Sequence, residues 1–502
     1  MKEYKSSYTI QAIWIGLGSL CSFLFSIVSA AILSRYLIKS DYGTYKQVMY
    51  VYSTLLSVFT LGLPLAFSYF LPRVNLAQGK TLVDKINVVF FILGLIFAFV
   101  LYFGAGIVAD ILKNKSLKVC IEIFSPAPIF ILPTMGLQGI LATYRRTFLN
   151  AIYVLISRVF MLLCVALPVA IYKSDVKTAL YGFIIANFIS CVAALYFKNV
   201  PFKGVDASPC DVSYRQIFHY SFPLMLAGIS GIGIKAADQF YVSRYFGQEV
   251  FADFANGSLE LPFVSMVLSA GGTVLLPVFS RMLFDNTPLS SIMDLWQRTA
   301  IKAALILYPL VVFCLFFALP IMTFVYGDNY ALSADFFRIK LLVNFFTVVQ
   351  FYPIILAMGK TEEYFKTNII VLFLVWGMEY LSIILFNNAY VVTAVSTLCH
   401  LILILLMLNI VSCEIHIKLW QLFPIKKMLL NLVCCLLAVT PAYLLINMTQ
   451  LFHLKLLSLI IGFITYSILL LIFSKILNID YMNIIQPLIY RINSKKHDKT
   501  NT

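Results

Sequence analysis

SRYLIKSDYGTY, from Ser34 to Tyr45, is the stretch that decides how this chain is organised, because it occurs twice. A second copy, SRYFGQEVFADF, runs from Ser243 to Phe254. Both copies follow one long apolar run and precede another. The copies lie roughly 200 positions apart, which is too long for a solenoid repeat. The spacing instead indicates the two halves of an internally duplicated transporter.

The composition is that of a membrane protein. The chain has 502 residues, of which 61% are hydrophobic and 12% are charged, whereas a soluble domain has about a quarter of its residues charged. The net charge of +15 is spread in short clusters between apolar runs. Such clusters set membrane topology and do not indicate nucleic-acid binding. The ten cysteines show no CxxC or Cys/His spacing, so we expect neither disulfides nor a metal site.

Apolar runs of about 20 residues predict an all-α polytopic membrane protein with about fourteen transmembrane helices. The predicted helices span 8–33, 44–71, 86–108, 119–142, 148–172, 179–197, 216–243, 251–279, 302–325, 336–358, 366–386, 390–412, 428–447 and 455–476. They predict two pseudo-symmetric six-helix lobes plus two C-terminal helices. The corresponding segments are an N-terminal lobe at 1–200, a C-terminal lobe at 201–415, two additional helices in 416–476 and a basic tail at 477–502.

The distribution of lysine and arginine predicts that both termini are cytoplasmic. The connections placed inside by this topology hold about twice as many basic residues as those placed outside. Lys80, Lys85 and Lys198 belong to the inner set, and the linker between the lobes begins at Lys198. The connection with Lys113 and Lys115 runs against this bias.

Two predicted helices, at 216–243 and 8–33, carry a stripe of small and polar residues at helical spacing. The members are Ser221, Gly228, Gly231, Lys235 and Asp238 in the later helix, and Ser19, Ser22, Ser26 and Ser29 in the earlier one. Helix packing is an equally good explanation of the glycines and serines. Lys235 and Asp238 are three positions apart, so an ion pair between them is an alternative to a role in binding.

Arg158 lies near the middle of the helix predicted at 148–172. Because arginine does not lose its proton, it needs water, a carboxylate or an anionic ligand at this depth. Glu260 and Glu379 are predicted at membrane depth in the helices at 251–279 and 366–386. These carboxylates either hold a cation or a proton, or form structural pairs with a basic residue such as Arg158.

Other polar residues have a simpler explanation. Lys46 and Lys340 lie within a few residues of predicted helix ends, so we expect them to extend to the membrane interface. For His400 we expect a hydrogen-bonded position in the core. The chain has no GxxxxGK[ST] loop and no zinc or nucleophile motif. We therefore expect neither an enzyme nor a bound cofactor.

The repeated motif and its surroundings resemble a known family. AAILSRYLIKSDYGTYKQ, followed by FTLGLPLAFSYFLPR, is similar to the opening of the bacterial polysaccharide-biosynthesis flippases of the oligosaccharide or O-antigen type. These flippases belong to the multidrug/oligosaccharidyl-lipid/polysaccharide exporter superfamily. DQFYVSRYFGQEVFADFANGSLELP resembles the same region of the related lipid II flippases. The resemblance implies two six-helix lobes around a central cavity.

The resemblance also implies a function. A member of this family moves a polyprenyl-diphosphate-linked oligosaccharide from the cytoplasmic to the periplasmic leaflet of the bacterial inner membrane by alternating access. The product serves capsule, O-antigen (lipopolysaccharide) or exopolysaccharide biosynthesis. The implied partners are this lipid-linked substrate, membrane lipids, and a polysaccharide polymerase with its chain-length machinery.

The site residues expected from this function are of two kinds. The candidates for substrate binding are Arg158, Lys235, Arg35, Arg244, Ser26 and Ser29. The candidates for holding a coupling ion, H⁺ or Na⁺, are Asp238, Glu260 and Glu379.

Two other functions compete with this one. A multidrug exporter of the same superfamily would favour an anionic cavity for cationic drugs, and Arg158 argues against that. A membrane-embedded glycan polymerase or glycosyltransferase would need a sizeable loop outside the membrane, and no such loop is predicted.

Overall fold

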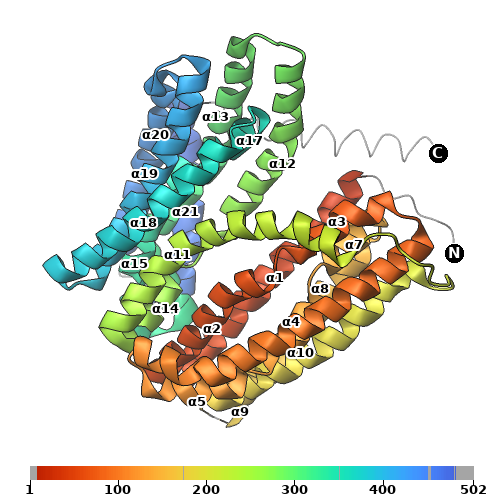
Figure 1. Ribbon diagram of the computed structural model, residues 1–502. Coiled ribbons are helices and arrows are strands. Elements are labelled where there is room, and N and C mark those ends of the chain that lie inside the picture. Colours follow the sequence, from red (N-terminus) through yellow and green to blue (C-terminus); the bar gives the residue numbers. More distant parts are fainter. Residues whose placement is uncertain (1–7, 173–174, 350, 450–453, 480, 482–502) are drawn as a thin grey trace, which may run out of the picture. The chain divides into compact units, whose positions relative to one another are not determined.

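The computed structural model describes residues 8–172, 175–349, 351–449, 454–479 and 481. The regular structure of these residues is helical throughout, which confirms the predicted all-α class (Figure 1). Ten of the helices are long and apolar enough to cross a membrane, or up to thirteen if each bent helix pair is one span. The count of fourteen spans stays a prediction.

The described helices fall into two compact units. The first unit comprises the chain up to Asn256 together with Val325–Asn329 and Leu372–Val392. Its helices are α1 (Tyr8–Tyr36), α2 (Lys39–Phe59), α3 (Leu63–Phe70), α4 (Leu76–Ile111), α5 (Lys115–Phe124), α6 (Ala127–Ile131), α7 (Leu137–Thr143), α8 (Thr147–Met161), α9 (Leu167–Tyr172), α10 (Val176–Asn199) and α11 (Tyr214–Gly257). Within this unit α1 packs along α8, α8 packs along α10, and α4 packs on α5 and α6.

The second predicted span is broken, where the sequence predicted one continuous helix at 44–71. Helix α2 ends at Phe59, and α3 continues from Leu63 with a bend of 43°. Gly62 lies in the break with a φ of 68°, a backbone conformation that favours glycine. Pro64 then stands in the first turn of α3, where proline is well tolerated.

The predicted seventh and eighth helices also differ from the structure. Helix α11 runs to Gly257, with one non-helical residue at Gly247 (φ 80°) where the sequence predicted a connection. A second break follows, and α12 (Pro262–Phe284) begins with a proline at its first position. Glu260 lies in this break and is exposed, so the prediction that it sits inside a helix was wrong.

A π turn, η3 (Leu162–Ala166), separates α8 from α9 in the fifth span. Helix α10 approaches this π turn closely at Gly182. A Cβ on Gly182 would overlap the carbonyl oxygen of Cys164 in the π turn. Glycine at this position therefore allows α10 to pack against the irregular turn.

The linker after α10 is attached to the start of α4 by hydrogen bonds. Lys80 Nζ donates to the Val205 carbonyl at 2.8 Å, and Lys85 Nζ donates to the Cys210 carbonyl at 3.0 Å. The Thr81 hydroxyl donates to the Ser208 carbonyl at 2.6 Å. Lys80 and Lys85, which the sequence assigned to the inner basic residues, thus also bind the linker to α4.

The second unit contains the helices of the later part of the chain, three of which also have residues in the first unit. Its helices are α12, α13 (Leu289–Phe316), α14 (Ala318–Tyr326), α15 (Ser333–Leu341), α16 (Asn344–Thr347), α17 (Phe351–Ala357), α18 (Thr361–Phe386), α19 (Ala389–Ile415), α20 (Ile425–Met448) and α21 (Lys455–Ile476). The three with residues in the first unit are α14, α18 and α19. The core of this unit contains Trp296 and Phe317, both buried. Helices α20 and α21 share it, and Tyr466 of α21 donates a hydrogen bond to the Pro309 carbonyl at 3.1 Å. The predicted tail lies mostly outside the described residues.

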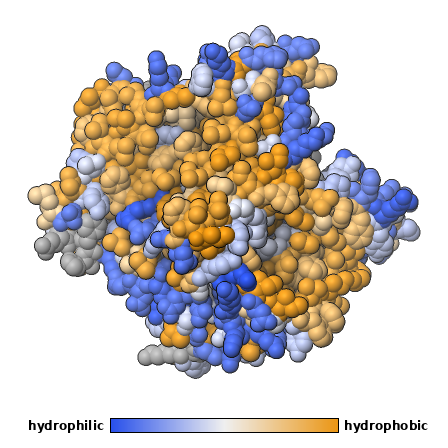
Figure 2. Space-filling view, turned by 60° about the vertical axis from the view of Figure 1, so that its left-hand side comes forward, coloured by the Kyte–Doolittle hydropathy of each residue, from blue (hydrophilic) through white to orange (hydrophobic). Residues whose placement is uncertain are grey.

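The surface carries broad apolar areas, as a lipid-facing protein requires. Figure 2 shows apolar side chains covering much of one face, with polar side chains gathered between and beside them. On α4 the exposed residues include Phe99, Phe103 and Ile107. Large exposed apolar patches are rare on soluble monomers. This supports the prediction of a multi-pass membrane protein.

The close approach at Gly182 makes a stability prediction. We expect Gly182→Ala to lower the melting temperature of the purified protein, because overpacking a tight contact costs about 1–3 kcal/mol. Gly104→Ala on α4 is the matched control, since nothing lies within 4 Å of a Cβ there. Thermal unfolding in detergent measures both variants. Equal melting temperatures for the two would contradict the assigned packing.

Candidate functional site

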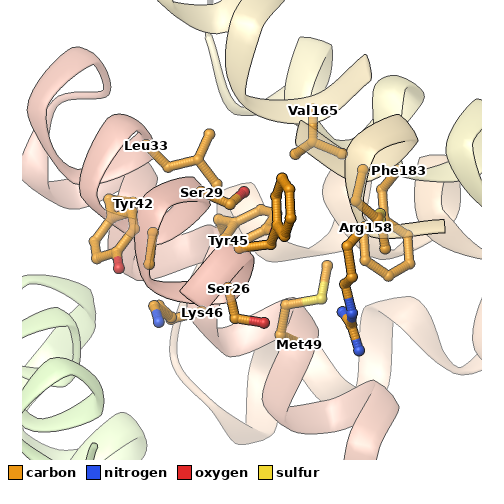
Figure 3. Close-up of a pocket in the computed structure, with 13 residues that line it drawn as sticks. Ser26, Ser29, Leu33, Tyr42, Tyr45, Lys46, Met49, Arg158, Val165 and Phe183 are labelled. Carbon is orange, nitrogen blue, oxygen red and sulfur yellow. The ribbon is translucent and has the colours of Figure 1, made fainter. Parts of the chain in front are cut away.

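A cavity of about 220 Å³ opens within the first unit, lined by residues of α1, α2, α8, η3 and α10. Its polar lining consists of Ser26, Ser29, Lys46 and Arg158, with the tyrosines 42 and 45. Figure 3 shows Arg158 and Lys46 at opposite sides of the cavity in this view, with Tyr45, Met49 and Ser26 between them. None of its lining residues is acidic. The cavity is therefore cationic.

Arg158 reaches the cavity from the last turn of α8, next to the π turn. The amide of Leu162 donates to the carbonyls of Arg158 and Val159, so the irregular turn begins directly at this residue. Turns of this kind are frequent at functional sites. In the described part of the chain, Arg158 has neither a hydrogen bond nor an ion pair, and the predicted structural pairing with a glutamate is absent there.

Lys46 is the residue of this cavity that the sequence prediction missed. The prediction placed it at a helix end, extended to the membrane interface. The structure begins α2 at Lys39, so Lys46 lies two turns inside the helix and lines the cavity. Its amine lies 5.2 Å from the centre of the Tyr42 ring, a cation–π distance.

Ser26 and Ser29, two members of the stripe on the first helix, line the same cavity, and their role in substrate binding stays a prediction. The Ser26 hydroxyl donates to the Ser22 carbonyl at 2.8 Å, which leaves its oxygen able to accept a further hydrogen bond. Two predicted substrate-binding serines and one predicted arginine thus come together with one unpredicted lysine.

The other three predicted cations do not line this cavity. Arg35 and Lys235 are exposed. Arg244 donates a hydrogen bond to the Ile111 carbonyl at the end of α4 and lies over the Tyr245 ring. For Arg244 the structure therefore indicates a structural contact.

Two predicted ion-coupling carboxylates are buried in the first unit. Asp238 on α11 is 2% exposed, and Glu379 on α18 is 0% exposed. Both lie within electrostatic range of the Tyr50 hydroxyl, which donates to the Ala236 carbonyl at 3.2 Å. Helix α18 is fixed to α11 by Trp376, whose indole N–H donates to the Gly233 carbonyl at 3.1 Å. Glu260 does not belong to this group, because it lies in the second unit.

No group of three or more His, Cys, Asp or Glu side chains that could hold a metal ion occurs among the described residues. His400 of α19 makes the expected core hydrogen bond, from its Nδ1 to the Ser396 carbonyl at 3.0 Å. The sequence placed Lys340 at the membrane interface. In the structure its Nζ donates a hydrogen bond to the Ser396 hydroxyl at 3.5 Å.

The two copies of the repeated motif contact each other through buried polar groups. Gln47 Nε2 donates to the Ser243 hydroxyl at 2.8 Å, and the Tyr42 hydroxyl donates to Asn256 Oδ1 at 2.7 Å. Gln47 and Asn256 occupy equivalent positions after Ser34 and Ser243, and each contacts the other copy. In both hydrogen bonds the residue of the first copy is the donor. We call these contacts, with the ion pair below, the motif interface.

An ion pair and a third amide complete the motif interface. Lys39 Nζ lies 2.7 Å from Asp253 Oδ2, and Asp253 is buried. Asn114, which caps α5, donates to Gln47 Oε1 at 2.6 Å and to the Thr44 hydroxyl at 3.0 Å. Polar groups buried in this way need partners, so the motif interface specifies one relative position of α2 and α11.

Comparison with solved structures shows which known proteins share this fold. The fold is similar to that of the lipid II flippase MurJ in an inward closed conformation, with a TM-score of 0.67 and 17% identity over 93% of this chain and 99% of MurJ. It is also similar to an inward-facing multidrug resistance MATE family transporter of the MOP superfamily. That match has a TM-score of 0.63 and 13% identity over 79% of this chain and 94% of the transporter.

A third similar structure is a MOP superfamily transporter from Pyrococcus furiosus, described by the reverse polarity of its binding pocket. Its TM-score is 0.56, with 13% identity over 80% of this chain and 95% of that one. The chain is thus a multi-pass membrane protein with the fold of the MOP superfamily transporters.

A family model named polysaccharide biosynthesis protein matches residues 32–335, more than half of the 502 residues. The chain therefore belongs to this polysaccharide biosynthesis protein family. No curated protein sequence matches it. The resemblance drawn from the repeated motif is confirmed.

The hydrogen bond from Tyr42 to Asn256 in the motif interface makes a stability prediction. We expect Tyr42→Phe to destabilise the protein by about 1–3 kcal/mol, because it leaves a buried amide oxygen of Asn256 without its donor. Tyr45→Phe is the control, since Tyr45 lines the cavity and the described structure gives its hydroxyl no hydrogen bond. Thermal unfolding measures both, and a larger loss for Tyr45→Phe would refute the assigned bond.

Proposed function

We propose that this protein is a flippase that moves a polyprenyl-diphosphate-linked oligosaccharide from the cytoplasmic to the periplasmic leaflet. The product would serve capsule, O-antigen or exopolysaccharide biosynthesis. The observation that carries the proposal is the cavity in the first unit, which has two cations and no acid in its lining. Membership of the polysaccharide biosynthesis protein family supports the same substrate class.

The chemistry of the cavity matches a diphosphate. An arginine guanidinium binds phosphate oxygens in a bidentate fashion, and a lysine ammonium adds a second charge. Both interactions are stronger in a cavity screened from bulk water. The hydroxyl of Ser29 supplies a further donor to the cavity.

The size of the cavity limits what it holds. At about 220 Å³ it is smaller than the roughly 300–1,000 Å³ of pockets that enclose a drug-sized ligand. It therefore suits the charged diphosphate of the substrate and not a whole oligosaccharide. The glycan and the lipid would lie outside it.

Transport would proceed by alternating access, with the motif interface as the outer closure. With both termini in the cytoplasm, as the basic residues predict, the connection between α1 and α2 lies on the periplasmic side. Opening towards that side would then separate α2 from α11 and break the hydrogen bonds of Tyr42 and Gln47.

Coupling to an ion would use the two buried carboxylates. Asp238 and Glu379 are buried in the same unit, and buried carboxylates in membrane proteins commonly carry protons or bind cations. We propose H⁺ or Na⁺ as the coupling ion. Glu260 is not proposed again, because it is exposed in a helix break.

The remaining expectations follow from this function. The protein would reside in a bacterial inner membrane, act as a transporter and not as an enzyme, and work beside a polysaccharide polymerase and its chain-length machinery. A multidrug exporter is the rival within the fold. Cationic drugs would be repelled by Arg158 and Lys46, so the cavity favours an anionic substrate.

The cavity cations give the test of this proposal. We expect Arg158→Ala and Lys46→Ala each to reduce glycan export by about 10- to 100-fold, because a hydrogen bond to a charged group contributes about 1.5–3 kcal/mol. Arg158→Lys should keep part of the activity, since it retains the charge without the bidentate geometry. Export is measured as surface glycan in cells with equal amounts of protein.

Lys302→Ala, at an exposed position of α13, is the matched control and should export normally. Normal export by Arg158→Ala would refute the proposed role of the cavity. Loss of efflux of cationic drugs with unchanged glycan export would favour the multidrug exporter instead.

The proposed outer closure gives a second test. Lys39→Met removes the ion pair with the buried Asp253, so we expect the periplasmic side to open more often. Labelling of Tyr45→Cys by a membrane-impermeant thiol reagent should rise about fivefold, the effect of about 1 kcal/mol. Mass spectrometry locates the label among the native cysteines.

Lys366→Met is the matched control, because it breaks the exposed ion pair with Glu362 on α18. It should leave the labelling of Tyr45→Cys unchanged. If both lysine variants gave the same labelling, Lys39 and Asp253 would not belong to an outer closure.

A further inference from the structure

Lys198, near the end of α10, is completely buried. The sequence placed it at the start of the basic cytoplasmic linker, one residue beyond the predicted helix. In the structure α10 continues through Asn199 and is followed by the 3-10 turn η4 (Val200–Phe202). Lys198 thereby stays inside the span, with an exposure of 0%.

The partners of Lys198 are few. Its Nζ donates one hydrogen bond, to Asn87 Oδ1 on α4 at 2.7 Å. It also lies over two aromatic rings, 5.1 Å from the centre of Phe67 and 5.4 Å from that of Phe90. An ammonium group has three N–H donors, so two of them face no acceptor in the described structure.

No carboxylate in the described residues forms an ion pair with Lys198. On α4, Asp84 is exposed and Lys85 is bonded to the Cys210 carbonyl. On α10 the titratable neighbour is Cys191, and α3 contributes the Phe67 ring. Burial disfavours the charged amine, whereas the amide oxygen and the ring faces favour it. The surroundings of Lys198 therefore contain one influence that favours the neutral amine and two that favour the charged ammonium.

The charge on Lys198 acts on α3 through Phe67. The ring of Phe67 is wedged between Lys198 and Gly136, which has a φ of 76°, and a Cβ on Gly136 would overlap the ring. The same turn of this short helix touches α11 two residues later. Tyr69 stacks on Tyr220 with ring centres 4.0 Å apart.

We propose that Lys198 and Asn87 form a proton-binding site that controls how tightly α3 packs in the first unit. With the proton bound, the ammonium attracts the face of Phe67 and holds α3. When the proton leaves Nζ for solvent, the neutral amine still donates to Asn87 but no longer attracts the ring. Helix α3 then loosens at its contact with Tyr220 of α11. The site does not depend on which substrate the protein moves.

Hydrogen exchange of α3 in the full-length protein in lipid nanodiscs tests this site. Exchange in wild type is compared with exchange in Lys198→Met at each pH from about 5.5 to about 9.5, below the range in which exposed lysines titrate. Taking the ratio at each pH cancels the intrinsic pH dependence of exchange. We expect α3 to exchange about 2- to 30-fold more slowly in wild type at low pH, with the ratio approaching one at high pH.

Two further variants are designed to keep a positive charge at position 198 at every pH. Asn87→Asp places a carboxylate beside the amine, so α3 should stay protected across the whole pH range. Lys198→Arg keeps a permanent charge and should do the same. Lys475→Met, at an exposed position of α21, is the control and should match wild type.

A ratio of wild type to Lys198→Met that is constant with pH would overturn the proposal. If Lys198→Met does not fold, wild type and Asn87→Asp decide the matter by themselves. Their α3 protection should diverge as the pH rises, and parallel curves would overturn the proposal equally.

Discussion

The hydrogen bonds between the two copies of the repeated motif are the constraint on which the first unit depends. Gln47 and Asn256 are equivalent residues, and each is bonded to the opposite copy. The copies also approach closely, since a Cβ on Gly43 would overlap the Gln248 carbonyl. When two copies of one sequence pack against each other, each copy must both form its own helix and provide residues that fit the other copy. This physical demand explains why the likeness between the halves is concentrated in the motif.

The wall of the cavity that carries Arg158 is built by one helix face and by close packing of α10. Arg158, Met161 and Val165 line the cavity at spacings that place them on one face of a helix. Gly182 lets α10 pack against the π turn after α8, and the next residue, Phe183, also lines the cavity. The close approach of α10 therefore helps to form the wall that carries the charge.

Sequence reasoning found Arg158, Ser26 and Ser29 because an arginine at mid-depth and a helical stripe are visible as spacing. It missed Lys46 and Lys198 because both depend on where a helix ends. Helix α2 begins at Lys39, earlier than hydropathy indicated, and α10 ends later. Polar residues at these ends lowered the apparent hydropathy, although tertiary partners extend the helices. For Glu260 the predicted helix was too long, because the helix breaks before Pro262 and a new helix begins there.

The cations of this unit differ in whether they can lose their charge. Arg158 keeps its proton in any protein environment, so it gives the cavity a permanent charge. Lys198 can lose its proton, yet it does not line the cavity and instead contacts Phe67 of α3. A proton exchanged at Lys198 would therefore leave the charge of Arg158 intact and alter helix packing instead. Separating the two sites allows proton concentration to act on conformation without weakening the attraction for an anionic substrate.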